Sequence, residues 1–185
     1  FYQVAKEQKL IPSDLPKTKI AVRDYLRNAN SEDIWTEMQG YVYGERMGDA
    51  SAYPDVVEFI KFARDKGVSM VIVSHKTRHP FMGPKYNLHQ AASDWIDNSL
   101  VDGEQRLFEK NQIFFESTKE EKVSRIADCN CDYYIDDLPE ILQMPGFPGK
   151  TARILFDPEN NHSNKGMHVK LNSWADIKRF YEEKW

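Results

Sequence analysis

The sequence predicts an α/β fold in which a mainly parallel sheet is covered by helices on both faces. From Tyr53 onward, short apolar runs rich in β-branched and aromatic residues alternate with segments of helical periodicity. The run 68–73 is short and strongly β-branched, which is typical of a strand buried on both faces. Residues 1–50 show helical patterns that no strand pattern interrupts. The sequence therefore predicts a helical domain over 1–50 and an α/β domain over 51–185.

The helical block 1–50 divides into three segments. Residues 1–9 have helical character and are followed by a break at 11–16, which contains two prolines. A second helix carries Val22 and Leu26 one turn apart. A third begins near Ser31, a suitable N-cap, and would bury Trp35 and Met38.

The block from 51 to 185 alternates between helices and strands. Gly67 supplies a stop for the first helix, and Ser173 caps the last one. Right-handed crossovers would bring the carboxyl ends of parallel strands to one edge of the sheet, which is where open α/β sheets bind ligands. The predicted helices span 54–66, 88–99, 117–127 and 173–184, and the predicted strands span 68–73, 113–115, 133–135 and 152–156.

Composition excludes several classes of protein. The chain has 185 residues, of which 41% are hydrophobic and 29% charged, so it can bury a core and does not resemble a disordered chain. No apolar run approaches the roughly 20 residues of a membrane helix. The net charge of −4 without a long basic run makes nucleic acid a poor partner. Cys129 and Cys131 are too close to form a disulfide scaffold, which favours a cytoplasmic location.

The ends of the predicted strands carry polar side chains. Ser74 ends the first strand, and Asp136 and Asp137 end the third. Lys119 and Lys122 lie in the helix between them. A hydroxyl, a cation and two carboxylates at one edge could hold a phosphate and a Mg²⁺ ion, because Mg²⁺ prefers oxygen ligands and commonly takes one or two carboxylates.

Each of these residues also has a structural interpretation. Asp137 could equally serve only as the cap of a short helix beginning near Pro139. Asp136 is harder to explain in this way, since an unpaired carboxylate directly after an apolar strand is costly. His75, Lys76 and Arg78 follow Ser74 and are expected to meet an anionic substrate at the mouth of the site. The segment 74–84 is interpreted equally well as a substrate loop or as an ordinary surface connection.

The order of these motifs resembles the haloacid dehalogenase (HAD) superfamily. Val71–Ser74, a lysine at a helix start, and Tyr133–Asp137 resemble motifs two, three and four of that family, and 53–60 resembles the usual lead-in to motif two. The helical block 1–50 resembles the cap inserted between motifs one and two. The resemblance covers nearly the whole chain and implies a HAD-like, Rossmann-like three-layer sandwich with a small helical cap.

The resemblance also implies roles for individual residues. Ser74 would hydrogen-bond the transferring phosphoryl group, and Lys119 would neutralise its charge, with Lys122 as the reserve candidate. Asp136 and Asp137 would bind Mg²⁺. The implied activity is hydrolysis of a small phosphorylated metabolite, a phosphate monoester, through an aspartyl-phosphate. Substrate identity and oligomeric state are not read from the sequence.

The sequence departs from the family at motif one. The family's Asp-x-Asp, whose first residue is the nucleophile, is absent before the cap. One interpretation is that the intact protein carries roughly 15–25 further N-terminal residues, enough for one strand and its loop. The alternative is a catalytically inactive binding or regulatory domain. In either case we expect the 185-residue chain alone to lack phosphatase activity.

Overall fold

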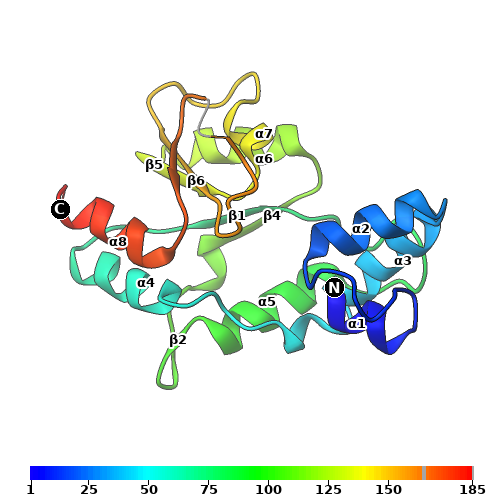
Figure 1. Ribbon diagram of the computed structural model, residues 1–185. Helices are drawn as coiled ribbons and strands as arrows, with labels where there is room; N and C mark the ends of the chain where they lie inside the picture. The colour runs from blue at the N-terminus through cyan, green and yellow to red at the C-terminus, as the bar shows by residue number, and fades with distance from the viewer. Residues whose placement is uncertain (164–165, 185) are drawn as a thin grey trace. The chain divides into compact units, whose positions relative to one another are not determined.

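The computed structural model describes residues 1–163 and 166–184, which form a mixed α/β structure (Figure 1). The chain divides into two compact units. The first comprises Phe1–Ala50 and Thr77–Trp95, and the second comprises Ser51–Lys76 and Ile96–Trp185. The first unit thus includes a segment that the sequence interpretation assigned to the α/β domain.

Three helices and a 3-10 turn form the first part of unit 1: α1 (Tyr2–Glu7), α2 (Lys19–Asn28), α3 (Glu32–Tyr43) and η1 (Met47–Asp49). Apolar residues at helical spacing face inward, so each helix contributes one stripe to a shared core. The buried members of that core are Val4, Ala5, Val22, Leu26, Trp35 and Met38. The helices predicted over 1–50 are confirmed.

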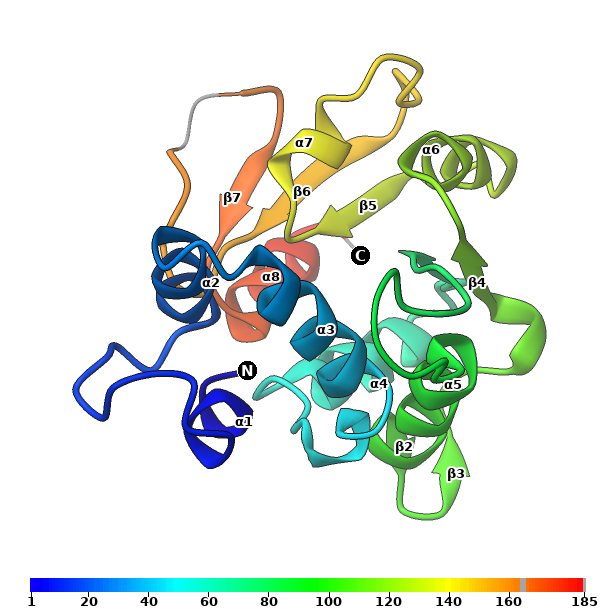
Figure 2. The same cartoon turned by 90° about the vertical axis from the view of Figure 1, so that its right-hand side faces the viewer.

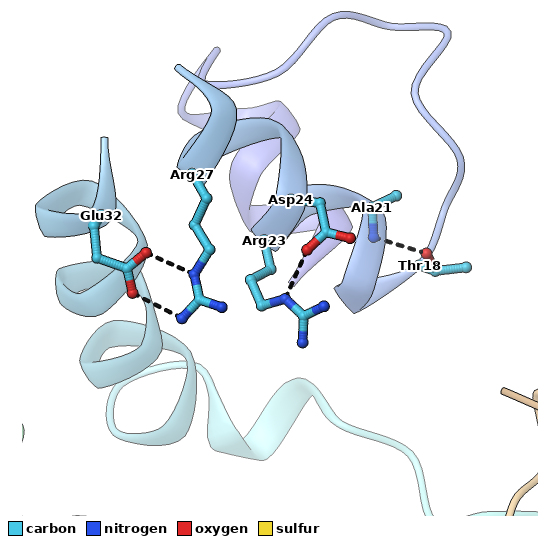
Figure 3. Close-up of polar contacts among 6 residues, drawn as sticks. All are labelled: Thr18, Ala21, Arg23, Asp24, Arg27 and Glu32. Carbon is cyan, nitrogen blue, oxygen red and sulfur yellow. Dashed lines mark hydrogen bonds and ion pairs between the residues drawn. The ribbon is translucent and has the colours of Figure 1, made fainter. Parts of the chain in front are cut away.

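Polar contacts define the ends of α2 and the turn into α3 (Figure 3). The hydroxyl of Thr18 accepts a hydrogen bond of 3.1 Å from the Ala21 amide and caps α2. Arg27 donates two hydrogen bonds, of 2.6 and 2.9 Å, to the carboxylate of Glu32. Both side chains are about half exposed, so this ion pair contributes less to stability than the apolar core. Ser31 is the N-cap of α3 as predicted, but its hydroxyl donates to the Ala29 carbonyl.

The segment after residue 76 belongs to unit 1 because it packs closely on α3. A Cβ atom added at Gly40 would lie 2.7 Å from the Pro80 side chain, and one at Gly44 would lie 2.4 Å from that of Tyr86. Two glycines one helical turn apart therefore let this loop approach the helix backbone. The loop leads into α5 (Leu88–Ser99), which occupies the predicted range.

Unit 2 contains all of the parallel strands. Strands β1 (Ile72–His75) and β4 (Ile113–Glu116) form one parallel pair, in which Ser74 lies opposite Phe115. A second sheet has the order β5 (Tyr133–Asp136), β6 (Ala152–Phe156) and β7 (Val169–Leu171), also parallel, and Figure 2 shows these three strands side by side. The remaining elements are α4 (Val56–Asp65), the hairpin β2 (Val101–Asp102) and β3 (Gln105–Arg106), η2 (Lys110–Gln112), α6 (Lys119–Asp128), α7 (Pro139–Leu142) and α8 (Trp174–Glu182).

Side chains from helices contact both faces of the three-stranded sheet. On one face Tyr134 and Leu155 join a buried cluster with Ile126 of α6 and Ile141 of α7. The opposite face is aromatic: Tyr133 packs edge-on against Tyr181, and Phe156 packs against Trp174, both from α8. Adjacent residues of a strand point to opposite faces, so these contacts explain why the strands are apolar at nearly every position.

The parallel strands form two sheets, where the sequence predicted a single one. Strands β1 and β5 each have one edge that no strand among the described residues pairs with. A side chain connects them: the Tyr134 hydroxyl on β5 donates a buried hydrogen bond of 2.7 Å to the backbone carbonyl of Val73 on β1. Within the described ranges, none of the helices combines the length and apolar character needed to cross a membrane.

Candidate active site

The centre of the candidate site is a buried ion pair between α6 and the end of β5. The ammonium nitrogen of Lys122 lies 2.6 Å from a carboxylate oxygen of Asp136, and the two side chains are only 8% and 3% exposed. Desolvation of two charges is costly, and their mutual attraction offsets it only when the geometry is good. The fold therefore keeps two buried charges here although their desolvation costs free energy.

The start of α6 determines which lysine turns inward. Thr118 is the N-cap, and it forms a capping box with Glu121, whose carboxylate accepts from the Thr118 amide at 3.0 Å. The sequence Ser117-Thr118-Lys119-Glu120 also fits a capping box, and the observed cap lies one residue later. Lys122 consequently lies on the buried face of the helix with Val123 and Ile126.

Lys119, the lysine that the sequence interpretation preferred, lies at the surface. Its ammonium group is 2.5 Å from the Glu140 carboxylate, and these side chains are 42% and 58% exposed. Lys122, the reserve candidate, is the lysine that contacts Asp136. The structure thus brings the reserve lysine, and not the preferred one, to the end of β5.

Asp136 has a partner for each of its carboxylate oxygens. One oxygen binds Lys122, and the other accepts a hydrogen bond of 3.0 Å from the Leu138 amide. Burial raises the pKa of Asp136 above its ordinary value, although Lys122 and the Leu138 N–H act in the opposite direction. The Leu138 contact also supports the start of α7, for which Leu138, and not Asp137, is the N-cap.

Ser74 lies on β1 beside the residue that joins the two sheets. Its neighbour Val73 accepts the hydrogen bond from Tyr134, which is two residues before Asp136. The half-buried Ser74 hydroxyl makes no side-chain hydrogen bond to any residue that the structure describes. The ammonium group of Lys122 lies 5.7 Å from the centre of the Tyr134 ring. Tyr134 is therefore in contact with both the serine strand and the ion pair.

Of the other predicted site residues, His75 and Asp137 are exposed and Lys76 is half-buried. The imidazole Nε2 of His75 lies 3.2 Å from the Ser117 carbonyl oxygen. The Lys76 amide donates to the Glu116 carbonyl at 2.8 Å, which continues the pairing of β1 with β4. The Asp137 side chain is exposed and makes no hydrogen bond within the described part of the chain.

Asp136 and Asp137 are the residues here that could hold a metal ion. Two carboxylates that are adjacent in sequence match the usual ligand set of Mg²⁺. This ion commonly takes one or two protein carboxylates and completes its coordination with water and substrate oxygens. Among the described residues, no group of three or more His, Cys, Asp or Glu side chains is arranged to hold a metal. A cation held by this pair would therefore depend on ligands from water and from a bound phosphate.

Tyr134 and Asp157 make contacts at the strand ends that the sequence pattern does not predict. Asp157 directly follows β6 and is 3% exposed, and it accepts hydrogen bonds of 2.9 Å from the Asn161 and His162 amides. Lys170 of β7 lies 3.3 Å from the same carboxylate. The available signal was a carboxylate directly after an apolar strand, the same signal that identified Asp136.

Comparison with protein-family models, curated proteins and solved structures finds no match to this chain.

Proposed function

We propose that this chain carries the phosphate-binding and metal-binding part of a Mg²⁺-dependent phosphohydrolase with a HAD-like fold. The main support is the buried contact between Lys122 and Asp136 at the carboxyl end of β5. Buried ion pairs with a perturbed carboxyl pKa are concentrated at functional sites. The parallel order of β5 and β6 adds support, since ligands of open α/β sheets bind beyond the carboxyl ends of the strands.

Each residue has a definite task in this proposal. The Ser74 hydroxyl donates a hydrogen bond to an oxygen of the phosphoryl group. The Lys122 ammonium neutralises the charge that this group carries and, by holding Asp136, fixes the direction of its carboxylate. Phosphoryl transfer requires mainly positioning and charge stabilisation, and a preformed cation in a buried site supplies both.

Asp136, assisted by Asp137, would hold Mg²⁺. The ion supplies further neutralisation of phosphoryl oxygens when bound. The Asp136 oxygens already accept hydrogen bonds from Lys122 and the Leu138 amide, so each oxygen has fewer lone pairs left for a metal ion. His75 and Lys76 follow Ser74 on the chain and would meet the anionic substrate, a small phosphate monoester, with Lys76 contributing positive charge.

The reaction also requires an aspartate nucleophile, which no Asp-x-Asp sequence in these 185 residues supplies. We assign the nucleophile to a strand, outside this sequence, that pairs with the open edges of β1 and β5. No described strand pairs with those edges, and an edge of this kind can accept an additional strand, although the Val73 carbonyl of β1 already accepts from Tyr134.

The test is phosphate release from a panel of phosphate monoesters, measured on the gene product that includes any residues encoded before Phe1. Activity should require Mg²⁺ and disappear with EDTA. Asp136→Asn and Ser74→Ala should each lower kcat by roughly 100-fold, the effect of removing one preorganised group from such a site. Lys119→Met is the matched control and should retain activity. Turnover without Mg²⁺, or full activity in Asp136→Asn, would reject the proposal.

A catalytically inactive binding or regulatory domain is the second candidate. The observation in its favour is the occupation of the Asp136 carboxylate by Lys122, combined with the missing nucleophile motif. Such a domain would bind phosphate monoesters without hydrolysing them. Binding of an intact ester by the same gene product, with no phosphate release over hours, would support this candidate.

A further inference from the structure

The loop between β1 and α5, residues 77–87, is closed and firmly held. The Leu88 amide donates to the Arg78 carbonyl at 2.9 Å, so the two ends of the loop meet. Across it, the His79 ring nitrogen Nδ1 lies 3.0 Å from the Tyr86 carbonyl oxygen, and the Thr77 hydroxyl donates to the His79 carbonyl at 2.9 Å. These contacts give the loop a defined conformation.

Close packing against α3 holds the middle of this loop. Pro80 and Tyr86 contact Gly40 and Gly44, and the Glu37 side chain lies against Gly83, which has a φ of +79°. The Tyr86 ring also packs edge-on against Tyr41. A loop fixed at this many points can present a side chain without a large loss of conformational entropy on binding.

Despite this packing, the tip of the loop exposes apolar side chains. Phe81 is 86% exposed and Met82 is 45% exposed. Phe81 is the most exposed large hydrophobic side chain in the described part of the molecule. An aromatic ring in water on a preorganised loop is a suitable surface for stacking.

The loop that carries this ring also carries two cations, Arg78 and Lys85, which are exposed and form no ion pair with any described residue. Within unit 1, residues 77–93 contain these two cations and no Asp or Glu, although the whole chain has a net charge of −4. Two carboxylates lie near the loop: Glu37 against Gly83, and Glu45, whose charge acts on the Tyr86 side chain. The charge and the ring together are complementary to an anion that bears a planar ring.

We infer that the loop 77–87 is a binding site for a nucleotide-like ligand, with the base stacked on Phe81 and the phosphate attracted by Arg78 and Lys85. Stacking on an aromatic side chain supplies part of the binding free energy of a base. Any base can stack in this way, because each has an aromatic face. The inference goes beyond the proposed function and does not require it, since every residue involved lies in unit 1.

The experiment is isothermal titration calorimetry of the 185-residue chain with adenosine 5′-monophosphate, and with ribose 5-phosphate as a ligand that lacks the ring. Phe81→Ala should weaken binding of the nucleotide by roughly 5- to 100-fold, the range for loss of one stacked base. Phe81→Trp should preserve it. Tyr25→Ala removes an exposed aromatic side chain, 39% accessible, from α2 in the same unit and is the matched control, which should bind as the original does.

Two charge variants extend the test. The double change Arg78→Gln with Lys85→Gln should weaken nucleotide binding and reduce its dependence on salt, whereas Glu37→Gln should strengthen binding. The inference is overturned if the unaltered chain does not bind the nucleotide at millimolar concentration, or if Phe81→Ala binds it as tightly as the original. If Ser74→Ala abolishes binding while Phe81→Ala has no effect, the proposed phosphate site stands and this inference fails.

Discussion

Lys122 and Asp136 form a 2.6 Å ion pair that is almost completely shielded from water, and Tyr134 connects this pair to the strand that carries Ser74. The relationship joins three elements that are distant in sequence: α6, β5 and β1. A buried pair of this kind stabilises a fold less than its short distance suggests, because both charges have lost their hydration.

The first prediction concerns the energetics of this pair. Asp136→Asn or Lys122→Met alone should lower the free energy of unfolding by about 3–5 kcal/mol, since each leaves a buried charge without its partner. The double variant should lose much less free energy of unfolding than the sum of the two single losses. Urea denaturation followed by circular dichroism measures all three. Lys119→Met is the control and should cost less than about 1 kcal/mol, because its pair with Glu140 is exposed. Additive losses would show that the two groups are not coupled.

The pH dependence of stability should carry the signature of Asp136. Its folded pKa is raised above the reference value of 3.8, so the folded state binds a proton more readily than the unfolded state does. The contribution to stability is then fully present below about pH 4 and is lost as pH rises through the folded pKa. The unfolding free energy of the original chain minus that of Asp136→Asn should therefore decrease as pH increases. A difference that stays constant from pH 4 to pH 8 would contradict the raised pKa.

Asp157 should show the opposite dependence. Burial acts to raise the pKa of Asp157, but the His162 and Asn161 amides and Lys170 outweigh it and hold the pKa below its usual value. The resulting stabilisation is present above the unfolded pKa and disappears as pH falls through the folded one. Asp157→Asn should cost about 1–3 kcal/mol at neutral pH, and the cost should shrink in acid. Urea denaturation at several pH values measures this, and a cost independent of pH would count against it.

Removal of the Tyr134 hydroxyl tests the connection between the two sheets. Tyr134→Phe leaves the Val73 carbonyl without this donor in a buried environment, which should cost about 1–3 kcal/mol. Tyr25→Phe, at an exposed position, should change stability by less than about 0.5 kcal/mol. Equal stability of the two variants would mean that the hydrogen bond between β5 and β1 contributes nothing.

Close packing of the loop on α3 gives a further prediction. A methyl group at Gly44 would lie 2.4 Å from the Tyr86 side chain, so Gly44→Ala should destabilise the chain by about 1–3 kcal/mol. Gly48→Ala is the matched control, because a Cβ there meets no atom within 4 Å. Thermal unfolding of both variants checks this, and an equal midpoint for the two would contradict the packing of Tyr86 on the helix.

The elements that the sequence predicted well are those with a strong local pattern. The helix 88–99 and the strand 152–156 have the predicted bounds, since apolar periodicity and a continuous apolar run identify them. Strand β7 was missed because it has only three residues and its first, Val169, is 43% exposed, as in an edge strand without an apolar run. Strand β1 spans Ile72–His75 and not the predicted 68–73. It begins four residues later and extends through His75, because its pairing with β4 runs from Ile72 opposite Ile113 to His75 opposite Glu116.

Choice between the two lysines required tertiary information. The sequence contains overlapping cap patterns that begin at Ser117 and Thr118, and a shift of one residue changes which lysine faces the sheet. Likewise, that Tyr134 reaches β1 follows from the spatial relation of two sheets, which no local pattern encodes. The sequence predicted the residue types at the candidate site, but it did not predict which of these residues are in contact.

The most direct test of the central claim is the binding of inorganic phosphate to the 185-residue chain, measured by calorimetry with and without Mg²⁺. Ser74 is well suited to this test, because its hydroxyl makes no side-chain hydrogen bond among the described residues and Ser74→Ala should leave the fold intact. We predict that Mg²⁺ strengthens phosphate binding and that Ser74→Ala weakens it by roughly 10- to 100-fold, the loss of one hydrogen bond to a charged group. Phosphate binding that is equal in the two chains, or absent from both, would contradict the account.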